Sequence, residues 1–253
     1  MLRNLLITLR FDGARYHGFQ VQENALSVCE AFQDAVQALL GERYAVKGCS
    51  RTDSGVHAEM YCLSMKTDHT IPCVGLLRAL NTALPWDIAA VGVCEVPIDF
   101  HARYSCLGKT YRYIIYNAPQ RDPFRPTRVY HCPYPLDAKL LNEQAADFCG
   151  THDFSAFCAA GSSVSDNVRT ITAASVVRAG DDVIFEVSGD GFLYNMVRIM
   201  AGTLLDIAAE KLLRGSIPQI IAGRERAGAG RTAPARGLYL YRVEYPDEFG
   251  VNT

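Results

Sequence analysis

The sequence predicts an α+β fold in which helices flank a mixed, largely antiparallel central sheet. Segments with alternating apolar residues recur along the whole chain, segments with helical spacing stand between them, and glycine turns join several neighbouring segments as hairpins. A doubly wound parallel sheet would instead show a strict alternation of strand and helix. The chain has 253 residues, of which 49% are hydrophobic, and it is long enough for one large domain or two smaller ones.

The first half of the chain begins with a strand pattern over residues 4–11, and Asp12-Gly13 closes this strand as a turn. Ser27 then opens the sequence S-V-C-E, which is a capping box, and helical spacing continues until Gly41. The further elements expected in this half are strands over residues 44–49, 58–67 and 88–96 and a short helix over 72–80.

The second half is expected to open with a strand pair over residues 102–105 and 109–117, followed by a Pro/Arg-rich loop over 118–128. Asp137 is expected to cap a helix that Gly150 stops near residue 148. The remaining expected elements are strands over 171–178 and 183–188 around the turn Gly180-Asp181, a helix over 195–211, a short helix capped by Ser216, and a strand over 238–245.

The two halves resemble each other in their order of elements. Each contains a strand, a glycine turn and a long amphipathic helix, in LLITLRFDG with SVCEAFQDAVQALL and in DVIFEVSGDG with NMVRIMAGTLLDIA. This echo predicts two related α/β lobes, over residues 1–105 and 106–253, with the active site in the cleft between them.

The spacing of the cysteines and the length of the apolar runs restrict the class of protein to which this chain can belong. The nine cysteines are scattered, and no two stand in a C-x-x-C relation, so we expect reduced thiols in a cytoplasmic protein and no metal site. No apolar run is long enough to cross a bilayer, and the N-terminus has the pattern of a strand, so no membrane association is expected.

The charge is unevenly distributed, although the formal net charge is only -2. Residues 101–128 hold six Lys and Arg residues against one acid, and residues 214–236 hold five arginines against one acid. Arginine forks suit phosphate and can stack on bases, so these clusters are candidates for such contacts, while ordinary solvated surface is an equally good interpretation of either one.

The segment SRTDSGVHA places charged residues in a loop between two expected strands. Arg51 close to Asp53 would keep the carboxylate ionised, and an ionised, positioned aspartate can act as a nucleophile or a base. On chemistry alone a polar turn is the commoner interpretation of Thr52-Asp53-Ser54-Gly55, because such residues favour turns. We interpret His57 as a structural, hydrogen-bonding residue.

Tyr111 lies in the expected strand over residues 109–117. Alternation places Tyr111, Tyr113 and Ile115 on one face and Arg112 on the other. A tyrosine that faces a cleft could stack on a base or move a proton, although a core tyrosine is the default for either one alone. Gly189-Asp190-Gly191 lacks the lysine of a phosphate loop, so no nucleotide cofactor is implied.

Together these segments resemble the tRNA pseudouridine synthase A family, the bacterial tRNA pseudouridine(38-40) synthases, over nearly the whole chain. Two small departures are Ser50, where the family often has glycine, and Phe19, where tryptophan is common. The segments that carry the resemblance, in the family's order, are RFDGARYHGFQVQ, SRTDSGVHA, FHARYSCLGKTYRYIIYN, GTHDFSAFC, VRTI, SGDGFLYNMVRIMAGTLL and PARGLYL.

The resemblance implies a role for each matching residue. Asp53 is implied to be the catalytic aspartate, with Arg51 as the arginine that pairs with it and helps to hold the target nucleotide out of the stack. Tyr111 is implied to be a catalytic residue that packs against the target base and could move a proton. The other implied substrate-binding residues are Leu238, which lines the pocket, and Arg198, a positive charge near the aspartate. Arg103, in the basic cluster over residues 101–128, is expected to contact phosphate.

The implied reaction isomerises uridine to pseudouridine in the anticodon stem-loop of tRNA, at positions 38, 39 and 40, without any cofactor. The resemblance also implies a homodimer that grips one tRNA. Two alternatives stay open on residues alone: a non-catalytic tRNA-binding or chaperone protein on the same scaffold, and an unrelated hydrolase with an aspartate nucleophile, for which no partner acid is found.

Overall fold

A computed structural model describes residues 2–161 and 164–249 of the chain. The chain divides into two compact units. The first unit comprises Met1–Leu107 together with Leu240–Thr253, and the second comprises Gly108–Tyr239. Each unit contains a sheet and helices, so the predicted α+β class is confirmed.

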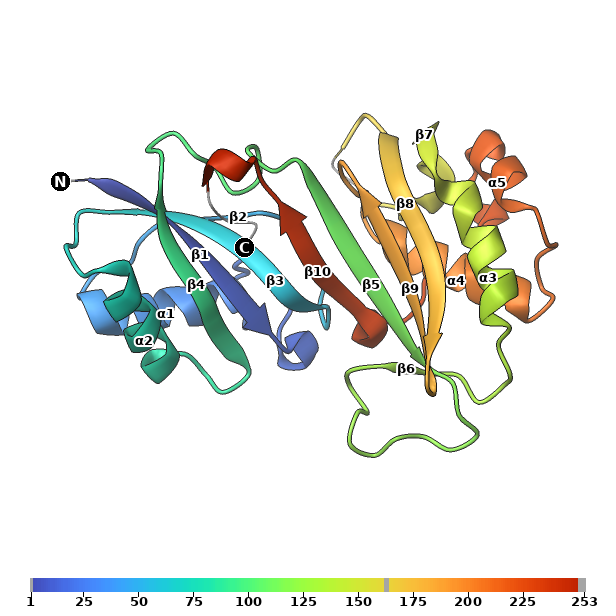
Figure 1. The fold of residues 1–253 in the computed structure, drawn as a ribbon, viewed down its shortest axis with the longest axis horizontal. Helices are drawn as coiled ribbons and strands as arrows, with labels where there is room; N and C mark the ends of the chain where they lie inside the picture. Colours follow the sequence, from blue (N-terminus) through green and yellow to red (C-terminus); the bar gives the residue numbers. More distant parts are fainter. Residues whose placement is uncertain (1, 162–163, 250–253) are drawn as a thin grey trace. The chain divides into compact units, whose positions relative to one another are not determined.

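The sheet of the first unit has the strand order β4-β1-β3-β10, and β2 pairs with β3. The pairs of β1 with β3 and β4, and of β2 with β3, are antiparallel. In Figure 1, α1 and α2 lie side by side next to this sheet. The strands are β1 (Arg3–Phe11), β2 (Val46–Gly48), β3 (His57–Thr67), β4 (Ile88–Val96) and β10 (Leu238–Glu244). Of β10, the residues from Leu240 onward belong to this unit.

The predicted ends of helix α1 (Val28–Leu40) are confirmed. The side chain of Ser27 accepts a hydrogen bond from the Glu30 backbone N at 3.2 Å, and Gly41 takes the left-handed conformation with φ 81°. Helix α2 (Cys73–Ala83) follows Pro72, which offers no side-chain cap. Both helices therefore begin where the sequence pattern places them, but only α1 has a side chain that satisfies its first turn.

The sheet of the second unit has the order β5-β9-β8-β7, with antiparallel pairs throughout, and β6 joins β5 in parallel. Gly180, at φ 60°, lies in the predicted turn between β8 and β9. The parallel pair of β5 with β6 makes the arrangement mixed and largely antiparallel, as predicted. The strands are β5 (Gly108–Tyr116), β6 (Tyr130–His131), β7 (Gly150–Asp153), β8 (Val168–Ala179) and β9 (Asp182–Gly189).

Three helices accompany this second sheet: α3 (Ala138–Ala145), α4 (Met196–Ala208) and α5 (Ile217–Gly223). Helix α3 packs against β8, and α4 packs against β5 and α3. The Asp137 carboxylate accepts hydrogen bonds from the first turn of α3, as predicted. Ser216 stands at the N-cap of α5, but its side chain makes no capping hydrogen bond.

The prediction of a strand over residues 102–105 is wrong, because these residues form a turn. The Ser105 backbone N donates to the His101 carbonyl at 2.9 Å, and the His101 backbone N donates to the Ser105 Oγ at 3.2 Å. Side chains of His101 and Ser105 thus occupy backbone groups that a strand would need for pairing. The helix predicted to end near residue 148 closes as a 3-10 turn over Ala146–Phe148, and Gly150 begins β7.

All nine cysteines are free thiols. Burial raises the pKa of Cys62 to about 12 and that of Cys29 to about 11. Among the described residues, no group of three His, Cys, Asp or Glu side chains could hold a metal ion. No helix within residues 2–161 and 164–249 is long and apolar enough to cross a membrane.

Candidate functional site

Asp53 lies half-buried in the loop between β2 and β3. Its backbone carbonyl accepts a hydrogen bond from the Val56 N at 3.2 Å, which closes a tight turn. Gly55 has φ 76° within this turn, a conformation that favours glycine. The backbone around Asp53 is therefore held in a defined path.

A second segment, over residues 12–18, supports this loop from the side. The Gly55 backbone N donates to the Tyr16 carbonyl at 3.1 Å. A Cβ on Gly13 would lie 1.9 Å from the Val56 carbonyl O, and a Cβ on Gly18 would lie 2.2 Å from the Thr52 carbonyl O. Only glycine permits two such close backbone approaches, so the two segments pack directly against each other.

Tyr16 fixes the supporting segment to the sheet. Its hydroxyl donates to Asp87 Oδ1 at 2.6 Å, and the Asp87 side chain, only 1% exposed, also pairs with Arg15 at 3.2 Å. Burial, and then the hydrogen bond to Asp87, raise the pKa of the Tyr16 phenol. The phenol therefore stays protonated and serves as a structural donor beneath the Asp53 loop.

His57 is buried at the start of β3 and binds the same supporting segment. The Gly13 backbone N donates to its Nδ1 at 3.0 Å, while Asp12 Oδ1 also lies 3.0 Å from that nitrogen. One nitrogen cannot accept from Gly13 and donate to Asp12 at once. We assign the hydrogen bond to Gly13, because the backbone fixes the direction of that proton. This contact is structural.

The residues before the loop rest on an aromatic pair. The rings of Phe19 and Tyr61 stack with centroids 4.2 Å apart, and Gly48 fits against both rings. The Tyr61 hydroxyl donates to the Ser50 carbonyl. Phe19 therefore has a packing role in the core, and Ser50 contributes its backbone to the same contact.

Tyr111 belongs to the second unit, where it is buried in β5 opposite Val187 of β9. Its ring meets Phe192 edge to face, with centroids 5.0 Å apart. The predicted alternation is confirmed, since Tyr113 and Ile115 are buried with Tyr111, whereas Arg112 is partly exposed. The Arg112 Nε donates to Glu186 at 2.6 Å on the other face.

Arg198 lies in α4 and is held by the segment before β10. Its Nε donates to the Ala233 carbonyl at 2.8 Å, its carbonyl accepts from the Ala233 N at 3.0 Å, and an NH1 proton goes to Asn195 at 2.6 Å. Leu238, buried at the start of β10, follows the same segment. The second unit thus holds both residues in defined places.

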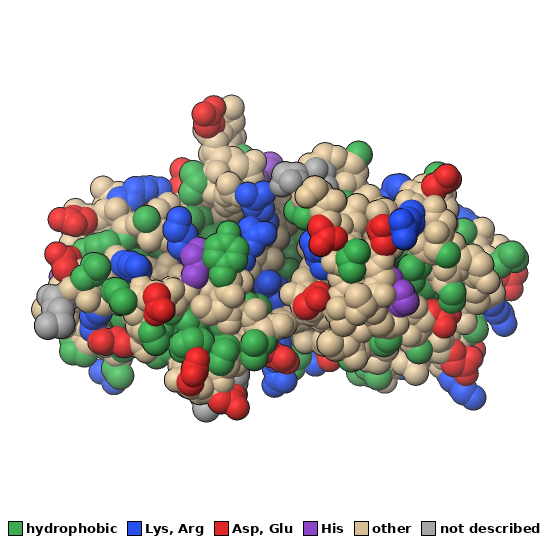
Figure 2. All heavy atoms as spheres, turned by 90° about the horizontal axis from the view of Figure 1, so that it is seen from above, with side chains coloured by type: hydrophobic (Ala, Val, Ile, Leu, Met, Phe, Trp, Pro, Cys, Tyr) green, Lys and Arg blue, Asp and Glu red, His purple; other side chains and the backbone are tan. Residues whose placement is uncertain are grey.

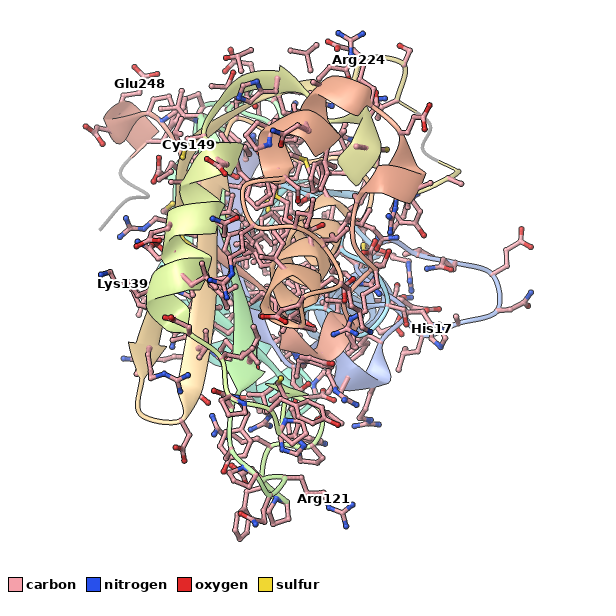
Figure 3. All side chains as sticks on the ribbon, turned by 90° about the vertical axis from the view of Figure 1, so that its right-hand side faces the viewer. His17, Arg121, Lys139, Cys149, Arg224 and Glu248 are labelled. Carbon is pink, nitrogen blue, oxygen red and sulfur yellow. The ribbon has the colours of Figure 1, made fainter. Side chains whose placement is uncertain are left out.

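The loop over residues 118–128 carries exposed arginines on an ordered base. Arg125 donates to Asp122 and to Asp182, each at 2.8 Å, which fastens the loop to the start of β9. Arg121 lies at the outer part of this loop and points away from the unit in Figure 3. The basic cluster over residues 101–128 therefore contains both structural and solvent-facing cations.

The six residues predicted from the sequence are divided between the units. Arg51, Asp53 and Arg103 are in the first unit, where Arg51 is exposed two residues before Asp53 and Arg103 is exposed on the 101–105 turn. The second unit holds the other three, which are Tyr111, Arg198 and Leu238.

Sequence reasoning from the residues missed the supporting role of Gly13, Tyr16 and Gly18. The sequence pattern indicates this role only weakly. A glycine shows that a special conformation or a close approach is allowed, but it does not show which distant backbone segment it contacts.

Comparisons with known proteins agree with the resemblance read from the sequence. The family model described as tRNA pseudouridine synthase matches residues 7–105 and 145–246, a range that contains every predicted site residue except Tyr111. Relatives called tRNA pseudouridine synthase A are 47% identical in Acetivibrio thermocellus and 44% identical in Clostridium acetobutylicum, each over 96% of this chain and 100% of the relative. A relative of the same name in Ruminiclostridium cellulolyticum is 47% identical over 245 residues. The chain therefore belongs to the tRNA pseudouridine synthase A family of RNA-modifying isomerases.

Proposed function

We propose that this protein converts uridine to pseudouridine at positions 38, 39 and 40 of the tRNA anticodon stem-loop, with Asp53 as its catalytic carboxylate. The full-length match to relatives called tRNA pseudouridine synthase A carries this proposal, since it covers the relatives from end to end. The packed loop that holds Asp53 supports it further. We also propose a cytoplasmic homodimer, in which local basic surface from two copies outweighs the net charge of -2.

The reaction needs one bond to break and one to form. The N1–C1′ bond of uridine breaks, the uracil turns, C5 bonds to C1′, and the proton lost from C5 is balanced by a proton gained at N1. Asp53 acts in its unprotonated form, by attack at C1′ or C6 or by removal of the C2′ proton. The hydrogen bonds and glycine contacts around the loop hold the backbone of Asp53 in place before substrate binds, which reduces the entropy cost of reaction.

The other residues are proposed to bind and hold the substrate. Arg51 helps to hold the flipped nucleotide out of the stack, a step that costs a few kcal/mol of unstacking. Tyr111 packs against the target base so that the detached uracil stays in place. Leu238 lines the pocket, Arg198 supplies positive charge near the aspartate, and Arg103 contacts phosphate.

The test is incubation of the protein with unmodified tRNA transcripts, followed by carbodiimide mapping of pseudouridine. We expect product at positions 38–40 with the natural chain, and no product above background with Asp53→Asn or Asp53→Ala. Binding of tRNA by these variants should stay within about threefold of the natural protein, because binding rests mainly on phosphate contacts elsewhere.

Asp68→Asn is the matched control, since it makes the same acid-to-amide change at an exposed position after β3. Undiminished pseudouridine in the Asp53→Ala product would refute the catalytic role of Asp53. Pseudouridine at other positions only would refute the proposed target.

A further inference from the structure

The turn over residues 101–105 presents an aromatic side chain and a cation to solvent. Tyr104 is 79% exposed, and its neighbour Arg103 is exposed as well. Ala102, directly before them, is fully buried. The turn therefore places an aromatic ring and a cation next to each other at the surface.

The base of this turn is fastened to the core of the first unit. The Ala102 backbone N donates to the buried Ser64 Oγ at 3.3 Å, and the Ala102 carbonyl accepts from the buried Tyr245 hydroxyl at 2.6 Å. The Arg103 backbone N donates to His101 Nδ1 at 3.1 Å. These bonds hold the backbone at Arg103 and Tyr104, so a ligand would meet an organised surface and not a mobile one.

The exposed ring has partners suited to nucleic acid. The His101 and Tyr104 rings lie with centroids 4.4 Å apart, and the Arg103 guanidinium lies 6.0 Å from the Tyr104 centroid. The pKa of His101 is lowered by burial and then by the positive charge of Lys47, with a further contribution from Arg103. Lys47 lies opposite Ser64 in the pair of β2 with β3, and Ser64 holds Ala102, so Lys47 and Arg103 both lie near this turn.

This combination matches one ligand chemistry better than others. An unpaired base stacks on an aromatic ring, while the phosphates on either side of it seek Arg and Lys. Figure 2 shows a face on which histidine and hydrophobic side chains lie directly beside Lys and Arg side chains. We propose that the His101–Ser105 turn is a stacking platform, on which Tyr104 holds an unpaired base of the substrate RNA and Arg103 and Lys47 hold its phosphates.

The position of Lys47 connects the platform with the Asp53 loop. Lys47 lies in β2, which ends at Gly48 and leads directly into the segment with Arg51 and Asp53. We expect the nucleotide on Tyr104 to belong to the same RNA that offers its uridine to Asp53. The inference rests on the proposed function for the identity of the RNA, and it adds a binding site for a second, unmodified base.

The experiment measures binding of an unmodified anticodon stem-loop RNA to the full chain. Tyr104→Ala should weaken binding about tenfold, the size typical of one lost base stack, whereas Tyr104→Phe should stay within about twofold. Arg103→Ala should lower the salt dependence of binding by about one phosphate. Tyr134→Ala, which removes a ring that is 75% exposed in the second unit, is the matched control and should bind normally.

A second arm replaces each loop nucleotide of the RNA in turn by an abasic one. At one position the abasic change should weaken binding by the natural protein but not by Tyr104→Ala, which shows that the ring and that base act together. Unchanged binding by Tyr104→Ala, an equal loss in Tyr104→Phe, or the absence of any coupled position would overturn the platform. A changed oligomeric state with normal RNA binding would also overturn it and would indicate a protein interface. Binding is measured apart from pseudouridine formation, so a failure of the proposed chemistry is recognised separately.

Discussion

Gly18 and Gly41 have almost the same backbone conformation, with φ 79° and 81°, but very different surroundings. A Cβ on Gly41 would meet nothing within 4 Å, whereas a Cβ on Gly18 would meet the carbonyl next to Asp53. A comparison of these two glycines therefore distinguishes two ways in which replacing a glycine lowers the free energy of unfolding. One is strain in the left-handed conformation, and the other is collision with the Asp53 loop.

We predict that Gly41→Ala lowers the free energy of unfolding by about 1 kcal/mol and leaves activity unchanged. Gly18→Ala should cost about 2–4 kcal/mol, because overpacking adds to the same strain, and it should also lower kcat by moving Thr52 and Asp53. Urea denaturation and pseudouridine kinetics measure the two effects. Equal kcat values in the two alanine variants would show that the contact with Gly18 does not position the loop.

At the scale of single residues, the sequence indicates which chemistry a side chain can perform better than it indicates where that side chain lies. Thr52-Asp53-Ser54-Gly55 has the composition of an ordinary polar turn, and its residues alone favour that interpretation. What distinguishes it is the segment over residues 12–18, some forty positions earlier, which touches the turn through backbone atoms. Side-chain patterns do not encode such backbone contacts.

At the scale of elements, Ser27 and Ser216 look alike in the sequence, since each precedes a helical segment. In the structure only Ser27 accepts a hydrogen bond from its helix, while Ser216 has helical dihedral angles and makes no such bond. A cap works only when its residue lies outside the helical conformation and turns its oxygen toward the first free N–H groups.

Ser27→Ala should therefore lower the free energy of unfolding by about 1 kcal/mol, and Ser216→Ala should change it by less than about 0.5 kcal/mol. Urea titrations followed by circular dichroism provide the comparison, with the natural chain as reference. A loss in Ser216→Ala as large as that in Ser27→Ala would contradict the assignment of these two caps.

The strand predicted over residues 102–105 shows how an element can be misjudged. The alternation of apolar and polar residues in this short piece is also compatible with a turn, and four residues are too few for periodicity to decide. Burial of Ala102 and the hydrogen bonds of His101 and Ser105 favour the turn. Longer patterns, such as those of β1, β9 and α1, were predicted correctly.

At the scale of the whole molecule, the last strand returns to the first unit. β10 pairs with β3, and Leu240 within it is fully buried. More than 170 residues separate Leu240 from the end of β3 at Thr67, so this pairing is long-range. The stability of the first unit thus depends on residues at the opposite end of the chain.

We predict that Leu240→Ala lowers the free energy of unfolding by about 2–5 kcal/mol, the usual cost of a cavity in a core, and weakens the hydrogen-exchange protection of β3. Arg242→Ala, an exposed change two residues further along the same strand, should cost less than about 0.5 kcal/mol. If β3 kept its full protection in Leu240→Ala, the dependence of the first unit on β10 would be refuted.

The sequence by itself determined the α+β class, most of the strands and helices, and the family, because these depend on local periodicity, on caps and turns, and on an ordered set of motifs. Only the tertiary structure decided that the 12–18 segment supports Asp53, that Arg103 and Tyr104 stand on an anchored turn, and that residues 240–249 complete the first unit. Each of these depends on contacts between residues far apart in the chain. Such contacts are selected by the packing of the whole core, and no local pattern specifies them.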